Sequence, residues 1–251
     1  MTLRLRSSAM TDAGPRRKHN EDAFVDRPDL GIWAVADGAG GHQAGEVASG
    51  MIAATLGEIS PGLGATEALA EIRARIGAVH RALIDEAARR GPGVAIASTV
   101  VVLCVRAAHY ACLWAGDSRA YCLSGGEFYQ VTRDHSLVQE LVDAGVIGAD
   151  ETERHPQANV ITRAVGAGEA DGLALDKATD VLRPGDRFLL CSDGLTKTIP
   201  EEHIAVLLGE GGEDAAQRLV EAALARQASD NVTAVVLDVL QGEPDQASID
   251  A

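Results

Sequence analysis

Residues 99–131 have the sequence TVVVLCVRAAHYACLWAGDSRAYCLSGGEFYQV, and this stretch decides the expected fold. Short apolar runs, many of them β-branched, alternate here with tight-turn signals at Gly116 and at Gly125-Gly126. Such runs are typical of buried strands, and strands joined by tight turns pair as antiparallel hairpins rather than as parallel crossover units. The stretch therefore favours consecutive antiparallel hairpins, whose natural product is a β-sandwich.

Further strand-like runs lie on both sides of this stretch. The alternation of Leu and Arg over Leu3–Arg6 suggests an opening strand with one buried face. Short apolar runs indicate more buried strands at Ala23–Asp26, Gly31–Ala36, Arg187–Cys191 and Val232–Val239.

Helical patterns come in two groups, one before and one after the central strands. Helices are expected over Ala44–Ile59, Thr66–Arg90 and roughly Glu213–Gln227. In the second of these, apolar residues recur at spacings of three and four and form one stripe: Leu69, Ile72, Ile76, Val79 and Leu83. Gly91-Pro92 ends it. The whole pattern predicts an α+β domain, a central antiparallel β-sandwich with helices packed outside it.

The organisation of the chain favours one domain over residues 1–240. We find no internal repeat and no interdomain linker in its 251 residues. Residues 133–163 break the strand rhythm with one short helix and a polar stretch, and we expect them to cross the surface as a mobile flap. Residues 241–251 are polar and are expected to be a frayed tail.

Composition excludes several classes of partner. With 22 basic and 37 acidic residues the net charge is −15, so nucleic acid and anionic membranes are poor partners for the chain. The four cysteines form no C-x-x-C pair and sit in apolar runs such as VVLC and FLLC, which indicates small buried side chains in a reducing compartment. No stretch resembles a signal peptide or approaches the ~20 apolar residues of a membrane span. We therefore expect a cytoplasmic protein without membrane insertion, and a monomer.

Acidic residues stand at the ends of the apolar runs. They are Asp37, Asp117, Asp193, Asp230 and the pair Glu21-Asp22. A single Asp-Gly after a strand is most often a turn. Several carboxylates at buried strand ends are costly unless a cation or hydrogen bonds compensate them. Oxygen ligands without His or Cys suit Mg²⁺ or Mn²⁺ rather than Zn²⁺.

The motifs that contain these acids follow one another along nearly the whole chain. In order they are GPRRKHNED (14–22), AVADGAGGHQAGEVAS (34–49), ASTV (97–100), AGDSR (115–119), RDHSL (133–137), ITRAVG (161–166), PGDRFLLCSDGL (184–195) and SDNVT (229–233). Their order and spacing resemble the PP2C-type (PPM) family, the metal-dependent Ser/Thr protein phosphatases, in its bacterial stand-alone form. The resemblance implies a four-layer αββα fold with a flap near residues 133–163.

The resemblance also implies a role for each matching residue. Asp37 would bridge two Mn²⁺ or Mg²⁺ ions, with Glu21 and the Gly38 carbonyl completing one ion's protein ligands. Asp193 and Asp230 would complete those of the other ion. A weaker third ion would be held by Asp117 together with Asp193.

The implied reaction is hydrolysis of phosphoserine and phosphothreonine by a metal-activated water. Asp22 would orient a water of the metal centre, and Arg17 would grip the phosphate with its fork of N–H donors. Arg16 and Lys18 flank Arg17, so the phosphate-binding register could shift by one, although G-x-x-R favours Arg17. His42 is either the donor that protonates the leaving alkoxide or a histidine that hydrogen-bonds its own loop.

Rival chemistries lack their signatures. A cysteine phosphatase needs C-x5-R, but six residues separate Cys112 from Arg119. An aspartyl-phosphate enzyme needs D-x-D, and FLLCSD continues with Gly-Leu. The remaining alternative is a non-catalytic homologue that binds metal or phosphopeptide, which the complete ligand set disfavours. Expected partners are phosphorylated proteins, among them a Ser/Thr kinase and its substrates. The N-terminal third resembles phosphatases that oppose a kinase in type VI secretion clusters.

Overall fold

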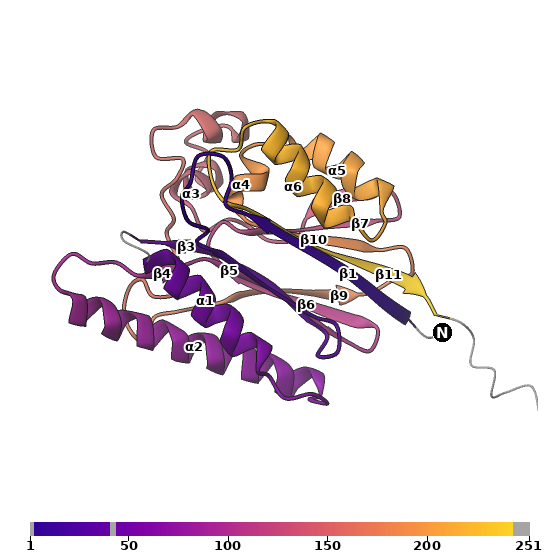
Figure 1. Ribbon diagram of the computed structural model, residues 1–251, viewed down its shortest axis with the longest axis horizontal. Helices are drawn as coiled ribbons and strands as arrows, with labels where there is room; N and C mark the ends of the chain where they lie inside the picture. The colour runs from indigo at the N-terminus through magenta and orange to yellow at the C-terminus, as the bar shows by residue number, and fades with distance from the viewer. Residues whose placement is uncertain (1–2, 41–43, 243–251) are drawn as a thin grey trace, which may run out of the picture.

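Two antiparallel sheets lie face to face in the middle of the molecule, and helices cover both outer faces (Figure 1). The computed structural model describes residues 3–40 and 44–242. The first sheet has the strand order β1 (Leu3–Asp12), β11 (Val232–Gln241), β10 (Arg187–Cys191), β7 (Arg119–Ser124) and β8 (Glu127–Gln130).

The order of the second sheet is β2 (Asp22–Arg27), β3 (Ile32–Ala39), β5 (Val100–Arg106), β6 (His109–Ala115) and β9 (Asp176–Val181), and the short β4 (Ala97–Ser98) pairs with β3. The second sheet contains β5 and β6 of the central stretch, whereas β7 and β8 of the same stretch belong to the first sheet, so the chain crosses from one sheet to the other near Gly116. Strands β5 and β6 form a hairpin in which Val100 pairs with Ala115 and Arg106 with His109. All the strand pairs are antiparallel, as the tight turns of this stretch predict.

The helices form the two outer layers. One layer consists of α1 (Ala44–Gly57) and α2 (Ala65–Arg90), and the other contains α4 (Asp193–Thr196), α5 (Glu201–Glu210) and α6 (Ala215–Ala225). The four-layer αββα fold is therefore confirmed. No helix of residues 3–40 and 44–242 combines the length and the apolarity needed to cross a membrane.

Three apolar cores separate the four layers, which explains why the central strands are apolar on both faces. In β3, Trp33 and Val35 point into the core between the sheets, while Ile32 and Ala34 face α1 and α2. The third core joins the first sheet to α4, α5 and α6. Because successive side chains of a strand point to opposite faces, a strand buried on both sides reads as a continuous apolar run.

The long helix α2 buries the stripe that its sequence predicts. Ile72, Ile76, Val79 and Leu83 are buried in the core against the second sheet, whereas Leu69 is only partly buried at its edge. Each fully buried Ile or Leu contributes roughly 1.5–3 kcal/mol relative to an exposed one.

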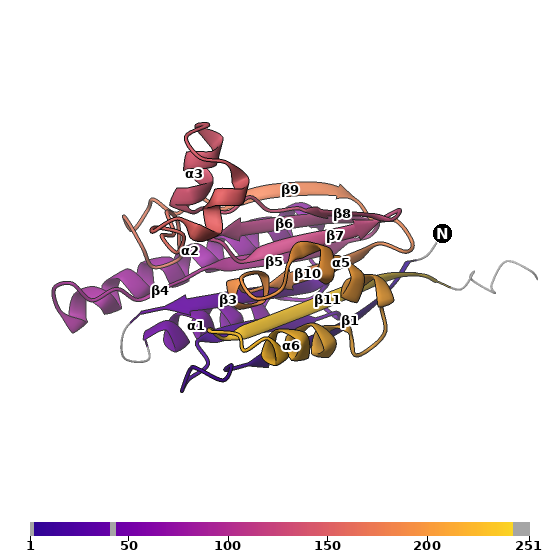
Figure 2. The same ribbon diagram turned by 90° about the horizontal axis from the view of Figure 1, so that it is seen from above.

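Residues 133–163, called the flap below, form the short helix α3 (Leu137–Asp143) and the 3-10 helix η1 (Ala149–Arg154). They stand off one side of the sandwich, where Figure 2 shows α3 projecting beyond the sheets. The expected short helix is thus present, and the mobility of the flap remains a prediction. Most of the expected tail, from residue 243 on, lies outside the described residues; β11 runs one residue into it, to Gln241.

The four cysteines are buried and unpaired, as expected from their apolar neighbours. Burial raises the pKa of Cys122 to about 11 and that of Cys191 to about 12, so neither thiol is a nucleophile near neutral pH.

Candidate metal centre

The acidic residues singled out by the sequence gather at one end of the sandwich. Asp22 opens β2 and pairs in register with Asp37 of β3. Asp117 follows β6, Asp193 follows β10, and Asp230 precedes β11. In antiparallel strands the end of one lies beside the start of its neighbour. The fold therefore brings together acids that are far apart in sequence.

Asp22 is buried and held by two hydroxyl groups. Its Oδ2 accepts hydrogen bonds from Ser192 Oγ at 2.7 Å and from Thr233 Oγ1 at 2.6 Å. Burial raises the pKa of Asp22 to about 6, although both hydrogen bonds lower it. Its Oδ1 has no hydrogen-bond partner among the described residues and is left as a free acceptor.

Asp37 lies at the electrostatic middle of the group. Burial, followed by the charges of Asp193, Asp22, Asp117 and Asp230, raises its pKa well above the usual range. Its backbone is fixed from the neighbouring strand: Thr99 N donates to Asp37 O at 2.9 Å, and Ser98 Oγ donates to the same oxygen at 3.0 Å. The backbone that carries the Asp37 side chain is thus fixed by two hydrogen bonds from residues 98 and 99.

Gly38 allows Glu21 and the start of α1 to approach β3 closely. Gly38 N donates to Glu21 O at 3.0 Å. A Cβ on Gly38 would lie 2.1 Å from Gly45 O, and one on Gly45 would lie 2.8 Å from Glu21 Cδ. Side chains at either glycine would therefore push Glu21 away from the Gly38 backbone. Glu21 is also held through its N–H, which donates to Asn231 Oδ1 at 2.8 Å.

Unpartnered buried oxygens test whether these residues suit a cation. Asp22, Asp117 and Asp193 each have a buried Oδ1 without a donor in the described part of the chain. Burial, reinforced by the charge of Asp193, raises the pKa of Asp117 to about 7. Buried carboxylate oxygens without donors are rare and costly, and a divalent cation satisfies them. The site therefore fits Mn²⁺ or Mg²⁺.

The carboxylates lie at the same end of the sandwich, but their side chains are not arranged around a common point. Within residues 3–40 and 44–242, no three His, Cys, Asp or Glu side chains are grouped closely enough to hold one ion. Two of these acids are paired with cations, Asp230 with Arg17 and Asp193 with Lys197. The assignment of individual ligands thus stays a prediction.

The phosphate-binding candidate reaches this centre. Arg17 Nη2 donates to Asp230 Oδ2 at 2.7 Å, with half of the Arg17 side chain exposed. Its neighbours Arg16 and Lys18 are exposed and form no ion pair in the described part of the chain. Of the three adjacent cations, Arg17 is the one that touches the acidic group. His42 lies outside the described residues, so both interpretations of it stay open.

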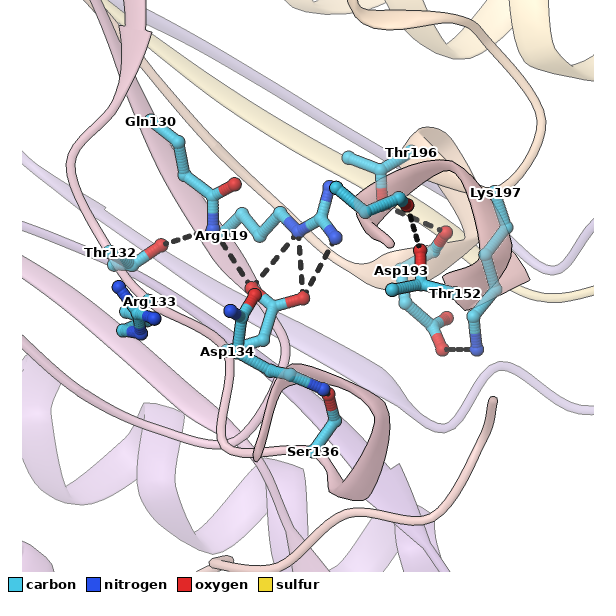
Figure 3. A network of polar contacts seen from close by, with 12 residues as sticks. Arg119, Gln130, Thr132, Arg133, Asp134, Ser136, Thr152, Asp193, Thr196 and Lys197 are labelled. Atoms are coloured by element: carbon cyan, nitrogen blue, oxygen red, sulfur yellow. Dashed lines mark hydrogen bonds and ion pairs between the residues drawn. The ribbon is translucent and has the colours of Figure 1, made fainter. Parts of the chain in front are cut away.

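Sequence reasoning missed a second cation. Lys197 follows α4, and its Nζ donates to Asp193 Oδ2, as Figure 3 shows, and also to Asn159 Oδ1 of the flap. The sequence could have indicated the Asp193–Lys197 pair, since positions 193 and 197 have the i,i+4 spacing of helical ion pairs. Nothing in the sequence pointed to the flap residue.

Arg119 and Asp134 form a second unforeseen pair beside the centre. Arg119 Nε and Nη2 donate to the Asp134 carboxylate at 2.8–3.0 Å, as Figure 3 shows. Both residues belong to motifs singled out in the sequence, but spacing alone gave neither a role. The pair ties β7 to the first residues of the flap.

His135 supports the turn that carries Asp117. Gly116 N donates to His135 Nδ1 at 3.1 Å, and His135 N donates to Gly116 O at 2.9 Å. The ring therefore accepts at Nδ1, and its Nε2 lies 3.2 Å from Asp176 Oδ2 and 3.0 Å from Arg163 Nη1. Burial lowers the pKa of His135, which favours the neutral ring that this contact needs.

A cavity of about 390 Å³ lies between the flap and α4 and opens beside the acids. Its lining includes Asp117, Asp193, Lys197 and, from the flap, Thr152 and Asn159. Polar groups of both signs line it, which suits a charged group of modest size rather than an apolar ligand.

Comparison with known proteins gives a consistent set of relatives. The family model "Protein phosphatase 2C" matches residues 16–236. The serine/threonine protein phosphatase PstP of Mycobacterium tuberculosis is 37% identical over 243 residues, which are 96% of this chain and 46% of that protein. The chain thus spans about half the length of this curated relative.

Solved structures agree with the sequence matches. The structure described as "PppA, a key regulatory component of T6SS in Pseudomonas aeruginosa" superposes with a TM-score of 0.87 at 41% identity, over 94% of this chain and 98% of that one. The catalytic domain of the serine threonine protein phosphatase PstP, solved with 2 manganese ions, gives a TM-score of 0.84 at 34% identity, over 96% and 100% of the two chains.

Proposed function

Because this chain belongs to the protein phosphatase 2C family, we propose that it is a phosphoric monoester hydrolase acting on phosphoserine and phosphothreonine in proteins, with two bound Mn²⁺ or Mg²⁺ ions. The observation that carries the proposal is the set of three buried carboxylate oxygens without donors, all at one end of the sandwich. The manganese ions of the PstP catalytic domain support the choice of cofactor.

We assign the ligands as the resemblance implies. Asp37 would be shared, with Glu21 and the Gly38 carbonyl on one ion and Asp193 and Asp230 on the other. Asp117 would hold a weaker third ion with Asp193. When bound, the ions would activate a water for attack on phosphorus and screen the phosphoryl oxygens.

The remaining steps use the chain's own side chains. Arg17 is exposed and long enough to turn from Asp230 toward a phosphoryl group, to which its planar fork can donate two hydrogen bonds. Asp22 is fixed through Oδ2 by Ser192 and Thr233, so its free Oδ1 can accept a hydrogen bond from the attacking water. His42 is kept as a candidate proton donor to the leaving alkoxide.

The setting of the activity is part of the same proposal. We infer a cytoplasmic, monomeric phosphatase whose single catalytic domain spans residues 1–240 and which opposes a bacterial Ser/Thr kinase. The description of the Pseudomonas aeruginosa relative as a key regulatory component of T6SS supports a regulatory role of this kind.

Hydrolysis of p-nitrophenyl phosphate and of a phosphothreonine peptide tests the proposal. We expect Mn²⁺-dependent turnover that EDTA abolishes and that Asp37→Asn lowers by roughly 10²-fold or more, because the shared ligand is lost. Asp85→Asn makes the same chemical change on the exposed face of α2 and should leave turnover unchanged. Metal-dependent binding of phosphopeptide without product would support the non-catalytic alternative instead.

A further inference from the structure

Lys197 connects two parts of the molecule that both line the 390 Å³ cavity, the start of α4 and the flap. Its Nζ donates to Asp193 Oδ2 at the start of α4 and, at 2.7 Å, to Asn159 Oδ1 near the end of the flap. One ammonium group thus contacts a candidate metal ligand and a surface segment at the same time (Figure 3 shows its contact with Asp193).

The Asn159 contact joins the second half of the flap to the rest of the protein, whereas the first half is also anchored by the buried Val138 of α3. The base of the flap is closed by backbone bonds within it, from Leu137 N to Val160 O and from Thr162 N to His135 O, both 2.8 Å long. Across the described residues, Lys197–Asn159 is the one side-chain hydrogen bond between flap residues 137–160 and any residue outside the flap. The exposed residues of η1 have no buried side chain to anchor them. Loss of this bond should therefore loosen residues 155–162.

The Asp193 contact places the ammonium where a cation would bind. Asp193 Oδ2 is taken by Lys197, while its Oδ1 is buried and has no donor in the described part of the chain. A cation bound to this carboxylate meets a positive charge a few ångströms away, in a partly buried setting where like charges repel strongly. The ion and the ammonium therefore compete for Asp193.

We propose that Lys197 is a positioning residue that couples cation binding at Asp193 to release of the flap. The proposal rests on the proposed function only in taking Asp193 as a metal ligand. An ion that displaces the ammonium from Asp193 also weakens its hold on Asn159, and the flap opens over the cavity. By thermodynamic linkage, a docked flap must in turn weaken ion binding by the same factor.

Calorimetric titration of the full chain with Mn²⁺ alone measures the first half of this coupling. We expect Lys197→Met to bind Mn²⁺ about tenfold more tightly than the wild type, within the usual range of coupling between sites. Lys177→Met removes an equal charge from the exposed face of β9 and serves as the matched control, with unchanged affinity. Asp193→Asn identifies the relevant binding event, because it should lower the Mn²⁺ affinity of the site that contains Asp193. The affinities of the two lysine variants are compared for that site.

Amide hydrogen exchange of residues 155–162 measures the second half. In the wild type, Mn²⁺ should accelerate exchange of this segment. In Lys197→Met and in Asn159→Leu, exchange should be fast without Mn²⁺ and unaffected by it. The coupling is wrong if Lys197→Met matches Lys177→Met in both measurements. If Asp193→Asn leaves Mn²⁺ affinity unchanged, the ligand assignment of the proposed function fails and the coupling falls with it.

Discussion

Arg17 and Lys197 show how single cations are used around the acidic end of the sandwich. Each is paired with one carboxylate, Asp230 or Asp193, that we assign to the same ion. The sequence predicted which acids and which arginine belong to the candidate site, because each of them lies in a short continuous motif. It did not predict that Ser192 and Thr233 hold Asp22, since these partners are 170 and 211 residues away along the chain. Contacts of that range are set by the sheet register.

Arg17→Ala should raise KM for phosphorylated substrates more than it lowers kcat. Its guanidinium contacts a phosphate similarly in the ground state and in the transition state, and uniform binding of this kind appears in KM. Steady-state kinetics on p-nitrophenyl phosphate measure the two constants. Arg16→Ala is the matched control, and a larger effect there would move the phosphate contact by one residue.

His135 should make stability depend on pH. Burial lowers the pKa of His135 in the folded protein below the ordinary histidine value of 6.5, so the unfolded chain takes up the proton first as pH falls. The stability contributed by the neutral ring is present above about pH 6.5 and is lost progressively below it.

Urea unfolding at about pH 7.5 and about pH 5.5 checks this expectation. The midpoint should fall less between the two values in His135→Gln than in the wild type. His109→Gln alters an exposed histidine at the far end of the hairpin and should keep the wild-type difference. Equal differences in all three proteins would contradict the role given to the Gly116 contact.

The strands and helices that could be predicted from the sequence are those with a clear apolar pattern. Strand β10 was predicted at Arg187–Cys191 and has those bounds, because it is buried on both faces. Strand β9 was missed: its sequence Asp-Lys-Ala-Thr-Asp-Val is polar and mostly exposed, and only pairing with β6 makes it a strand. Helix α5 was also not placed by its sequence, although Ile204 and Leu208 are buried.

The flap should govern protein substrates more than small ones. Replacing Gly148–His155 by a short Gly-Ser linker removes η1, which has no buried residue, so the fold should survive. We expect hydrolysis of a phosphothreonine protein to fall much more than that of p-nitrophenyl phosphate. Equal losses on both substrates would rule against a recognition role for this segment.

The acids at one end of the sandwich oppose folding of the entire chain when they are charged together. Burial raises the pKa of Asp22, Asp37 and Asp117, which reflects the cost of keeping these carboxylates ionised. The net charge of −15 adds to the repulsion. Cation binding should therefore stabilise the whole fold as well as supply chemistry.

Mn²⁺ should raise the urea midpoint of the full chain, by an amount equivalent to about 2.7 kcal/mol at a hundredfold excess over its Kd. In EDTA, Asp37→Asn should be at least as stable as the wild type, because a repelling charge is gone, and Mn²⁺ should stabilise it less. Asp85→Asn should respond to Mn²⁺ as the wild type does. A midpoint that Mn²⁺ does not change would contradict a cation site in the folded state.

The polar sequence of β9, which gave no recognisable strand pattern, has another effect. As the outer strand of the second sheet, β9 pairs with β6 on one side only along its described length, which leaves backbone groups open to another chain. Asp176, Lys177 and Asp180 place charges along this edge. A strand from a second molecule that aligned here would have to bury them, so the edge resists intermolecular sheet growth and aggregation. Substituting apolar β-branched residues there would make β9 easy to recognise in the sequence and would remove that protection.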